Sequence, residues 1–159
     1  GLGTPSLGAV RTLVLVPIKA FTAAKARLGD ALDAQARADL ARELAATILA
    51  AQCTDARVNL ADVPGARVVR ADVRRWHPGP ADVVVADPSR HGLGAPVVQR
   101  ISATGAGTVV LVSCDPGALG RDAGDLVRSG YALAAIRLVD MFPHTPHVEV
   151  VTTWQLLAS

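Results

Sequence analysis

The stretch "TVVLVSCDPGALGRD", residues 108–122, joins a buried strand to a helix. The apolar run that follows Thr108 is rich in β-branched residues and is typical of a core strand. Asp115 is then suited to be a helix N-cap, and Pro116 to be the first helical residue. Cys114 therefore falls at the carboxyl end of a strand, where ligands bind in open α/β sheets. A thiol there is either a nucleophile activated by the helix amino terminus or a small buried apolar side chain.

The composition indicates a globular chain of ordinary domain size. Half of the 159 residues are hydrophobic and 19% are charged, so the chain has enough apolar residues to fold around a core. The net charge of +2 is too small to indicate a nucleic-acid partner by itself. Two widely separated cysteines fit a reducing compartment, and no apolar stretch reaches the length of a membrane span. The amino terminus lacks the pattern of a signal peptide, so we expect a cytoplasmic protein.

Alternating strands and helices are expected along most of the chain. Residues 1–10 are predicted to be a flexible lead-in and residues 11–159 a single α/β domain. The patterns predict strands at 12–16, 66–70, 82–87, 108–114, 131–142 and 147–157, and helices at 33–60 (with a break at 52–55), 94–105 and 116–130. This order predicts a mostly parallel sheet with helices on both faces and a C-terminal antiparallel hairpin. It resembles the Rossmann-like fold of class I methyltransferases.

Three segments place chemically reactive residues at predicted strand ends. "VVVADPSRHGLG" carries Asp87, "VVLVSCDPGALGRD" carries Cys114, and "VDMFPHTPHVEVV" carries Glu149. Together they resemble the motifs of the RNA uracil-5-methyltransferases, which make 5-methyluridine in transfer and ribosomal RNA. The resemblance covers about residues 53–156. Because three motifs occur in order at fitting spacing, the likeness is highly specific.

The resemblance implies a covalent methylation of uridine that uses S-adenosyl-L-methionine. C5 of uracil is a weak nucleophile until a thiolate adds to C6, and a base must afterwards remove the C5 proton. By resemblance, Cys114 is the nucleophile and Glu149 is the base. Glu149 is one of only two glutamates in the chain. Its residue type and position alone would also fit a strand residue that faces solvent.

The resemblance also implies roles in binding. Asp72 corresponds to a position near the cofactor's adenine and Asp87 to one between cofactor and uracil, and Arg90 is a candidate for substrate binding that would orient a phosphate or Asp87. From the residues alone, Asp87 fits a turn after a strand and Arg90 fits a surface arginine. Ser89 replaces the second proline of the family's Asp-Pro-Pro-Arg motif, and Asp115 replaces the asparagine after the cysteine. RNA is the implied partner, and neither a membrane nor a metal ion is expected.

The amino-terminal third departs from this family. Residues 12–50 are similar instead to the start of the 2-phospholactate guanylyltransferases. Lys19, Lys25 and Arg27 match that family's nucleotide-binding loop, and such a cationic cluster after a strand suits phosphate. It would equally fit the solvated start of a basic helix. The two resemblances predict a seam near residues 50–55.

The departure removes the glycine-rich turn that holds the cofactor in class I methyltransferases. The segment "VPIKAFTAAKARLG", residues 16–29, stands in its place, and its only glycine is the last residue. We therefore predict a uracil-5-methyltransferase catalytic domain with an incomplete cofactor site. The alternatives are a guanylyltransferase-like nucleotide-binding module and an inactive folded chimera. The first reading requires Asp87 and Cys114 to end adjacent strands at one sheet edge, with Glu149 approaching Cys114 across that edge.

Overall fold

The computed structural model describes residues 11–15, 35, 51–140 and 148–158. It divides into two compact units, Gly1–Pro17 with Asp72–Ser159, and Ile18–Ala71, and each is treated by itself. The lead-in at residues 1–10 lies outside the described residues, as do Lys19, Lys25 and Arg27. The single domain and the seam near residues 50–55 stay predictions.

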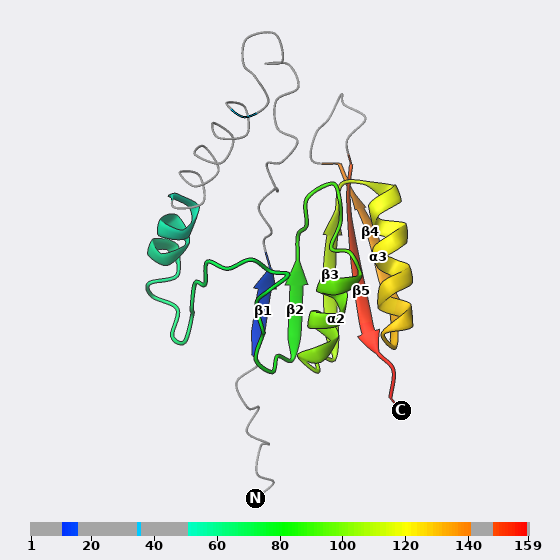
Figure 1. The fold of residues 1–159 in the computed structure, drawn as a ribbon, viewed down its shortest axis with the longest axis horizontal. Helices are drawn as coiled ribbons and strands as arrows, with labels where there is room; N and C mark the ends of the chain where they lie inside the picture. The colour runs from blue at the N-terminus through cyan, green and yellow to red at the C-terminus, as the bar shows by residue number, and fades with distance from the viewer. Residues whose placement is uncertain (1–10, 16–34, 36–50, 141–147, 159) are drawn as a thin grey trace, which may run out of the picture. The chain divides into compact units, whose positions relative to one another are not determined.

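The first unit is built on a five-stranded sheet (Figure 1). Its strands are β1 (Thr12–Leu15), β2 (Val83–Ala86), β3 (Thr108–Ser113), β4 (Tyr131–Val139) and β5 (Glu149–Leu156). Their order in the sheet is β1-β2-β3-β5-β4. β1, β2 and β3 are parallel, while β5 runs antiparallel to both β3 and β4. The predicted parallel sheet with an antiparallel C-terminal hairpin is confirmed, and β5 lies between β3 and β4.

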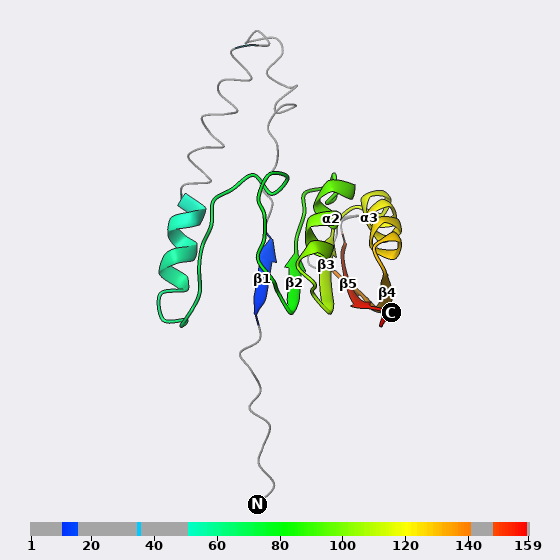
Figure 2. The same ribbon diagram turned by 60° about the horizontal axis from the view of Figure 1, so that its bottom comes forward.

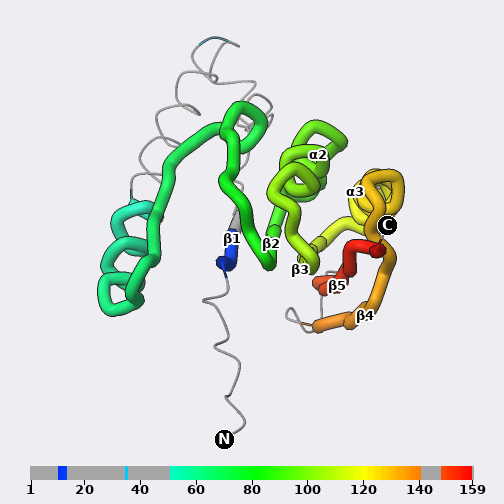
Figure 3. Tube along the Cα trace, turned by 90° about the horizontal axis from the view of Figure 1, so that it is seen from below, coloured from blue at the N-terminus to red at the C-terminus, as the bar shows by residue number. Residues whose placement is uncertain are grey.

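Two helices cover this sheet, α2 (Ala95–Ala103) and α3 (Pro116–Arg128). Asp115 is the N-cap of α3 and Pro116 opens the helix, as predicted. Both helices lie on the same side of the sheet (Figures 2 and 3), so α2 and α3 do not provide the expected cover of both faces. The reason is that the two crossovers, β2 to β3 and β3 to β4, advance in the same direction with the same hand.

The core fills the space between this face and the two helices. Along β3 and β5 every second residue is buried, which is the two-residue period of a sheet with one covered face. The fully buried members include Val84, Val109 and Leu111 from the strands and Ile101 and Leu126 from the helices. β4 lies at the edge of the sheet, and after Tyr131 its residues are largely exposed.

The second unit is described over residue 35 and residues 51–71. Residues 51–59 form a continuous helix, so the predicted break at residues 52–55 is wrong there. The strand predicted at residues 66–70 is also wrong, because these residues have no regular structure. A strand needs a hydrogen-bonded neighbour, whereas Val69 is 47% exposed and the run "VV" is flanked by arginines. None of the described helices has both the length and the apolarity needed to cross a membrane.

Candidate active site

Three strand ends bring the predicted reactive residues to one edge of the sheet. Asp87 directly follows β2 and Cys114 directly follows β3, and these two strands are parallel neighbours. Glu149 is the first residue of β5, which runs the opposite way and therefore starts where β3 ends. The shared edge predicted for Asp87 and Cys114 is confirmed. Their chemical roles stay predictions.

The backbone around Cys114 is fixed by its two neighbours. The Ser113 hydroxyl donates to the Asp115 carbonyl at 3.1 Å and accepts from the Asp115 amide at 3.4 Å. The Asp115 carboxylate in turn accepts from the Ala118 amide at 2.7 Å, which caps α3. Cys114 is half-buried and directly precedes Asp115, the N-cap of the 13-residue helix α3.

The register of β3 and β5 places Glu149 and Cys114 at the same end of the ladder. Ser113 and Val150 are its last pair, and Cys114 and Glu149 are the next residues along the chain from that pair. The predicted approach of Glu149 to the Cys114 strand is therefore confirmed for the backbone. On the alternating pattern of β5, Glu149 is half-buried and points to the face opposite α2 and α3.

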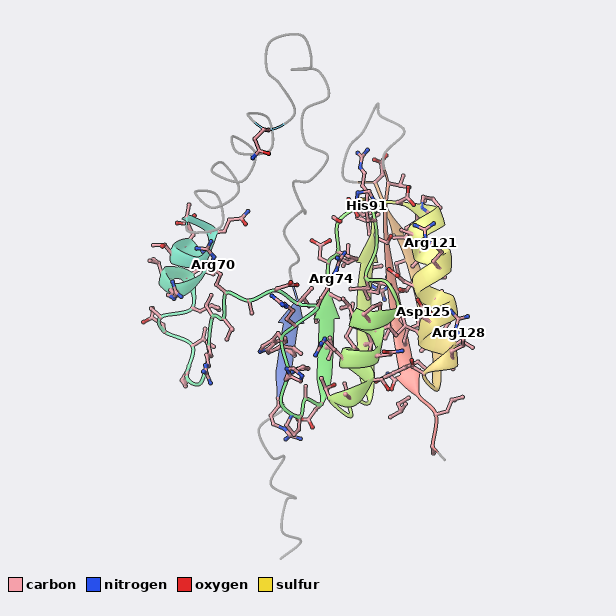
Figure 4. The ribbon with its side chains drawn as sticks, in the orientation of Figure 1. Arg70, Arg74, His91, Arg121, Asp125 and Arg128 are labelled. Atoms are coloured by element: carbon pink, nitrogen blue, oxygen red, sulfur yellow. The ribbon has the colours of Figure 1, made fainter. Side chains whose placement is uncertain are left out.

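Asp87 and Arg90 belong to the loop that connects β2 to α2. Both side chains are exposed, whereas Pro88 between them is buried and anchors the loop. The amide of Gly92 donates to the carbonyl of Ser89 at 2.8 Å, which closes a tight turn around Arg90. The loop is therefore ordered at its base and presents its charged side chains outward. In Figure 4, His91 of this loop and Arg121 of α3 both lie toward the carboxyl ends of β2 and β3.

Among the described residues, the candidate side chains themselves have no partner, unlike those of Ser113 and Asp115. Within the described part of the chain, no hydrogen bond or ion pair joins the side chains of Asp87, Arg90, Cys114 or Glu149 to another protein group. Elsewhere in the described residues, every buried side-chain nitrogen or oxygen has a hydrogen-bond partner. The arrangement leaves a nucleophile, two carboxylates and a cation free to bind a polar ligand.

Asp72 does not join this cluster. It was predicted to follow a strand, but the residues before it have no regular structure. Its carboxylate accepts from the Arg74 amide at 3.0 Å and its carbonyl accepts from Trp76, so it opens a turn of its own. Its predicted role near a cofactor stays a prediction. In the described residues, no group of three or more metal-ligating side chains is present.

One polar residue near the site was missed by the sequence reasoning. Asp122 is 2% exposed, and its carboxylate accepts from the amides of Leu93 and Gly94 in the loop after β2. A signal was available in the sequence. Asp122 falls between Ala118 and Leu126 at helical spacing, on the stripe of α3 that faces the core.

The chain is similar in sequence to RNA methyltransferases. It is 41% identical over 101 residues to an uncharacterized RNA methyltransferase of Streptomyces coelicolor, covering 61% of this chain and 22% of that protein. It is 47% identical over 81 residues to the 23S rRNA (uracil(1939)-C(5))-methyltransferase RlmD of Alkalilimnicola ehrlichii, covering 50% of this chain and 18% of that protein. No family model matches the chain. The predicted resemblance to RNA methyltransferases, a uracil-5 enzyme among them, is confirmed, and the chain spans about a fifth of the length of these two relatives.

The fold is that of class I methyltransferases. A solved protein of Thermoplasma acidophilum, assigned as a methyltransferase, superposes with a TM-score of 0.52 at 13% identity. The match covers 94% of this chain and 70% of that protein. At this level of identity the likeness concerns the fold alone.

Proposed function

We propose that this chain carries the catalytic part of an RNA uracil-5-methyltransferase. The observation that carries the proposal is the placement of Asp87, Cys114 and Glu149 at the same ends of three neighbouring strands, with no side-chain partner among the residues that the structure describes. The same region is similar in sequence to a 23S rRNA uracil-C5 enzyme. The substrate is a uridine in RNA, and S-adenosyl-L-methionine is the methyl donor that the sequence resemblance implies.

Cys114 acts as the nucleophile and Glu149 as the base in the reaction at the uracil ring. The Cys114 thiolate forms a bond to C6, and the electrons of the C5–C6 double bond move onto C5 and the C4 carbonyl oxygen. C5 thereby becomes nucleophilic. Once C5 has gained a substituent, the Glu149 carboxylate takes the C5 proton, the double bond re-forms, and the sulfur leaves C6 as a thiolate. Asp87 accepts a hydrogen bond from the uracil edge, and Arg90 offers a cation to the RNA backbone.

The chain's residues fit the methyl donor only in part. Bound S-adenosylmethionine would supply an electrophilic methyl group to C5. Class I sites hold it with backbone amides of a glycine-rich turn, but the sequence after β1 reaches its first glycine only at Gly29. Asp72 opens a turn and does not end a strand. The residues present therefore do not form a complete cofactor site, and the chemistry that this chain supplies is the chemistry at C5 and C6.

A 5-fluorouridine RNA tests the proposal. Fluorine replaces the C5 hydrogen, so after methyl transfer Glu149 has no proton to remove and the bond from Cys114 to C6 persists. With excess S-adenosylmethionine, we expect a covalent protein–RNA adduct for the wild type and for Cys53→Ala, which removes the other cysteine. Cys114→Ala should form none. An adduct in Cys114→Ala would contradict the role of Cys114. A wild type that forms no adduct and also fails to exchange the C5 hydrogen of uridine with solvent would contradict the proposal.

A second reaction is independent of the methyl donor. After Cys114 adds to C6, the nucleophilic C5 can take a proton from water. Glu149 then removes one of the two C5 hydrogens and the thiolate leaves. The net result is exchange of the C5 hydrogen of uridine with solvent. The loss of deuterium from C5-labelled RNA therefore measures the chemistry at C5 and C6 without the methyl donor.

A further inference from the structure

A buried carboxylate links the helix after Cys114 to the loop that carries Asp87. Asp122 lies on the core-facing stripe of α3 between Ala118 and Leu126 and is 2% exposed. Burying an ionised carboxylate is strongly unfavourable unless hydrogen bonds replace its water. A residue of this kind, on a stripe that is otherwise apolar, has to be explained by what it binds.

Both oxygens of Asp122 bind the loop between β2 and α2. Oδ2 accepts from the Leu93 amide at 2.7 Å, and Oδ1 accepts from the Gly94 amide at 2.9 Å. Gly94 is the N-cap of α2 and has no side chain with which to cap that helix. The carboxylate from α3 therefore satisfies amide groups and supplies negative charge at the amino terminus of α2.

The loop is shaped to receive this carboxylate. Gly92 has a φ of 78° and Gly94 a φ of 74°, both in the left-handed region that favours glycine. A Cβ added at Gly92 would lie 2.5 Å from Oδ2 of Asp122, closer than van der Waals contact allows. Glycine at position 92 is thus required both by the backbone and by the approach of the carboxylate.

The two partners of this contact each lead to the site. The loop begins at Asp87, and Arg90 lies in its turn from Ser89 to Gly92. The amides that bind the carboxylate follow directly after this turn. α3 begins two residues after Cys114 and is capped by Asp115. The Asp122 contact therefore sets how the Asp87 loop stands relative to the helix that follows Cys114.

We propose that Asp122 is a positioning residue that clamps the β2–α2 loop to α3, and so holds Asp87 at the uracil bound at Cys114 and Arg90 at the RNA backbone. This role rests on the proposed function. Asp122 itself is buried and contacts no substrate. Its effect on the reaction passes through the loop, and above all through Asp87.

The clamp is tested directly by amide hydrogen exchange in the full chain. In Asp122→Asn the side chain keeps its size but loses its charge and one acceptor oxygen, so the Leu93 and Gly94 amides should exchange roughly ten- to hundredfold faster. Asp125→Asn, one turn further along α3, should leave both amides unchanged. Unchanged exchange in a folded Asp122→Asn would overturn the clamp.

Two glycine variants separate steric displacement from backbone strain. Gly92→Ala pushes a methyl group against Asp122, whereas Gly105→Ala has a similar positive φ of 72° and open space around it. We expect faster exchange of the Leu93 and Gly94 amides in the first variant only. Equal effects of the two variants would mean that strain, and not the carboxylate contact, governs the loop.

The positioning role is tested by a double-mutant cycle on C5 hydrogen exchange of uridine. A displacement of a positioning group by about 1 Å can lower a rate by about a hundredfold. We therefore expect Asp122→Asn to slow the exchange ten- to hundredfold. If Asp122 acts through Asp87, the double variant with Asp87→Asn should be no slower than Asp87→Asn alone, within about twofold.

The outcomes are separable. Multiplicative losses in the double variant would contradict a role through Asp87 and would leave Asp122 with a structural role only. Absence of C5 exchange in the wild type would contradict the proposed function and the positioning role with it. The amide measurement would still decide in that case whether the clamp exists.

Discussion

The sheet has an amino-terminal edge, where its parallel strands begin, and a carboxyl edge, where they end. The two differ in whether their polar side chains have hydrogen-bond or ion-pair partners. At the amino-terminal edge, Arg11 at the start of β1 pairs with Asp82 before β2 at 2.9 Å, and Tyr131 at the start of β4 donates to the Ala106 carbonyl at 2.8 Å. At the carboxyl edge, Asp87, Cys114 and Glu149 have no partner among the described residues. In the part of the chain that the structure describes, the amino-terminal edge is thus a closed edge, whose polar groups pair with one another, and the carboxyl edge is an open edge, whose candidate side chains have no protein partner.

A pocket at the closed edge makes the same point. It has a volume of about 150 Å³ and is lined by residues 11–13, Trp76 and residues 79–81. The lining contains no thiol, carboxylate or imidazole. A hollow without reactive groups is a weaker candidate than an edge with three of them, because chemistry needs placed functional groups as well as space. The comparison therefore separates residues that stabilise the fold from residues that serve chemistry.

The largest effect is expected at the open edge, from Glu149→Gln. The amide keeps the shape of the side chain but cannot accept the C5 proton, and a positioned general base contributes about 10²–10⁴-fold. We expect uridine C5 exchange to fall by that factor and the melting temperature to stay near that of the wild type. Gln155→Glu, which alters the far end of the same strand, serves as the control. A rate within threefold of the wild type in Glu149→Gln would show that another base acts.

The next effect concerns the methyl donor. Losing two or three hydrogen bonds of roughly 1.5–3 kcal/mol each with the glycine-rich turn would weaken binding by about a thousandfold or more. We therefore expect weak or undetectable binding of S-adenosylmethionine to this chain. Calorimetry measures this directly. A micromolar dissociation constant would mean that the segment from Lys19 to Arg27 forms a replacement loop.

A smaller effect is expected at the closed edge, from Tyr131→Phe. The ring stays buried while the hydrogen bond to the Ala106 carbonyl is lost, which should lower the free energy of unfolding by about 1 kcal/mol and the melting temperature by about 2–4 °C. Uridine C5 exchange should not change. A loss of exchange at unchanged stability would mean that the two edges are not independent.

The same tyrosine makes stability depend on pH at the alkaline end. Burial raises the pKa of the Tyr131 phenol above its ordinary value. Its contribution to stability is therefore complete below the ordinary tyrosine pKa of about 10 and is lost as pH rises through the folded-state value. Between pH 9 and pH 11, about one unit on each side of that pKa, the melting temperature should fall more steeply for the wild type than for Tyr131→Phe. Parallel curves would contradict this contribution.

The smallest effect is expected from the exposed Arg11–Asp82 pair. Hydrogen bonds from Arg11 hold the pKa of Asp82 below its ordinary value. The stabilisation is thus present above the unfolded carboxyl pKa of about 3.9 and is lost as pH falls through the lower folded-state value. Asp82→Asn should melt slightly below the wild type at neutral pH, and the difference should vanish in acid. A difference that persists in acid would indicate that the charge is not its cause.

The sequence predicted the elements around the site well. The strand before Cys114 and the helix after it were expected because an apolar run ends at Asp115 and Pro116, which are suited to cap and to open a helix. β2 and α2 followed from the same reasoning, with Gly94 and Gly105 at the boundaries of the helix. In each case a local signal marks the end of the element, and tertiary packing agrees with it.

Other features depended on partners that a sequence does not display. Residues 66–70 carry β-branched residues like those of β2, but no neighbouring strand binds them. The insertion of β5 between β3 and β4 is a choice of pairing that the hairpin pattern alone leaves open. From the sequence, Asp122 is an ordinary helical aspartate. Its role depends on the hydrogen bonds that it accepts from the Leu93 and Gly94 amides, which are distant in sequence.

The central claim is that Cys114 and Glu149 act together on C5 and C6 of uridine, and its most direct test is C5 hydrogen exchange without any methyl donor. RNA deuterated at C5 of uridine is incubated with the full chain, and the loss of deuterium is followed by mass spectrometry. We predict that the wild type and Cys53→Ala release the label, whereas Cys114→Ala does not. Label retained with the folded wild type, or released equally by Cys114→Ala, would contradict the account.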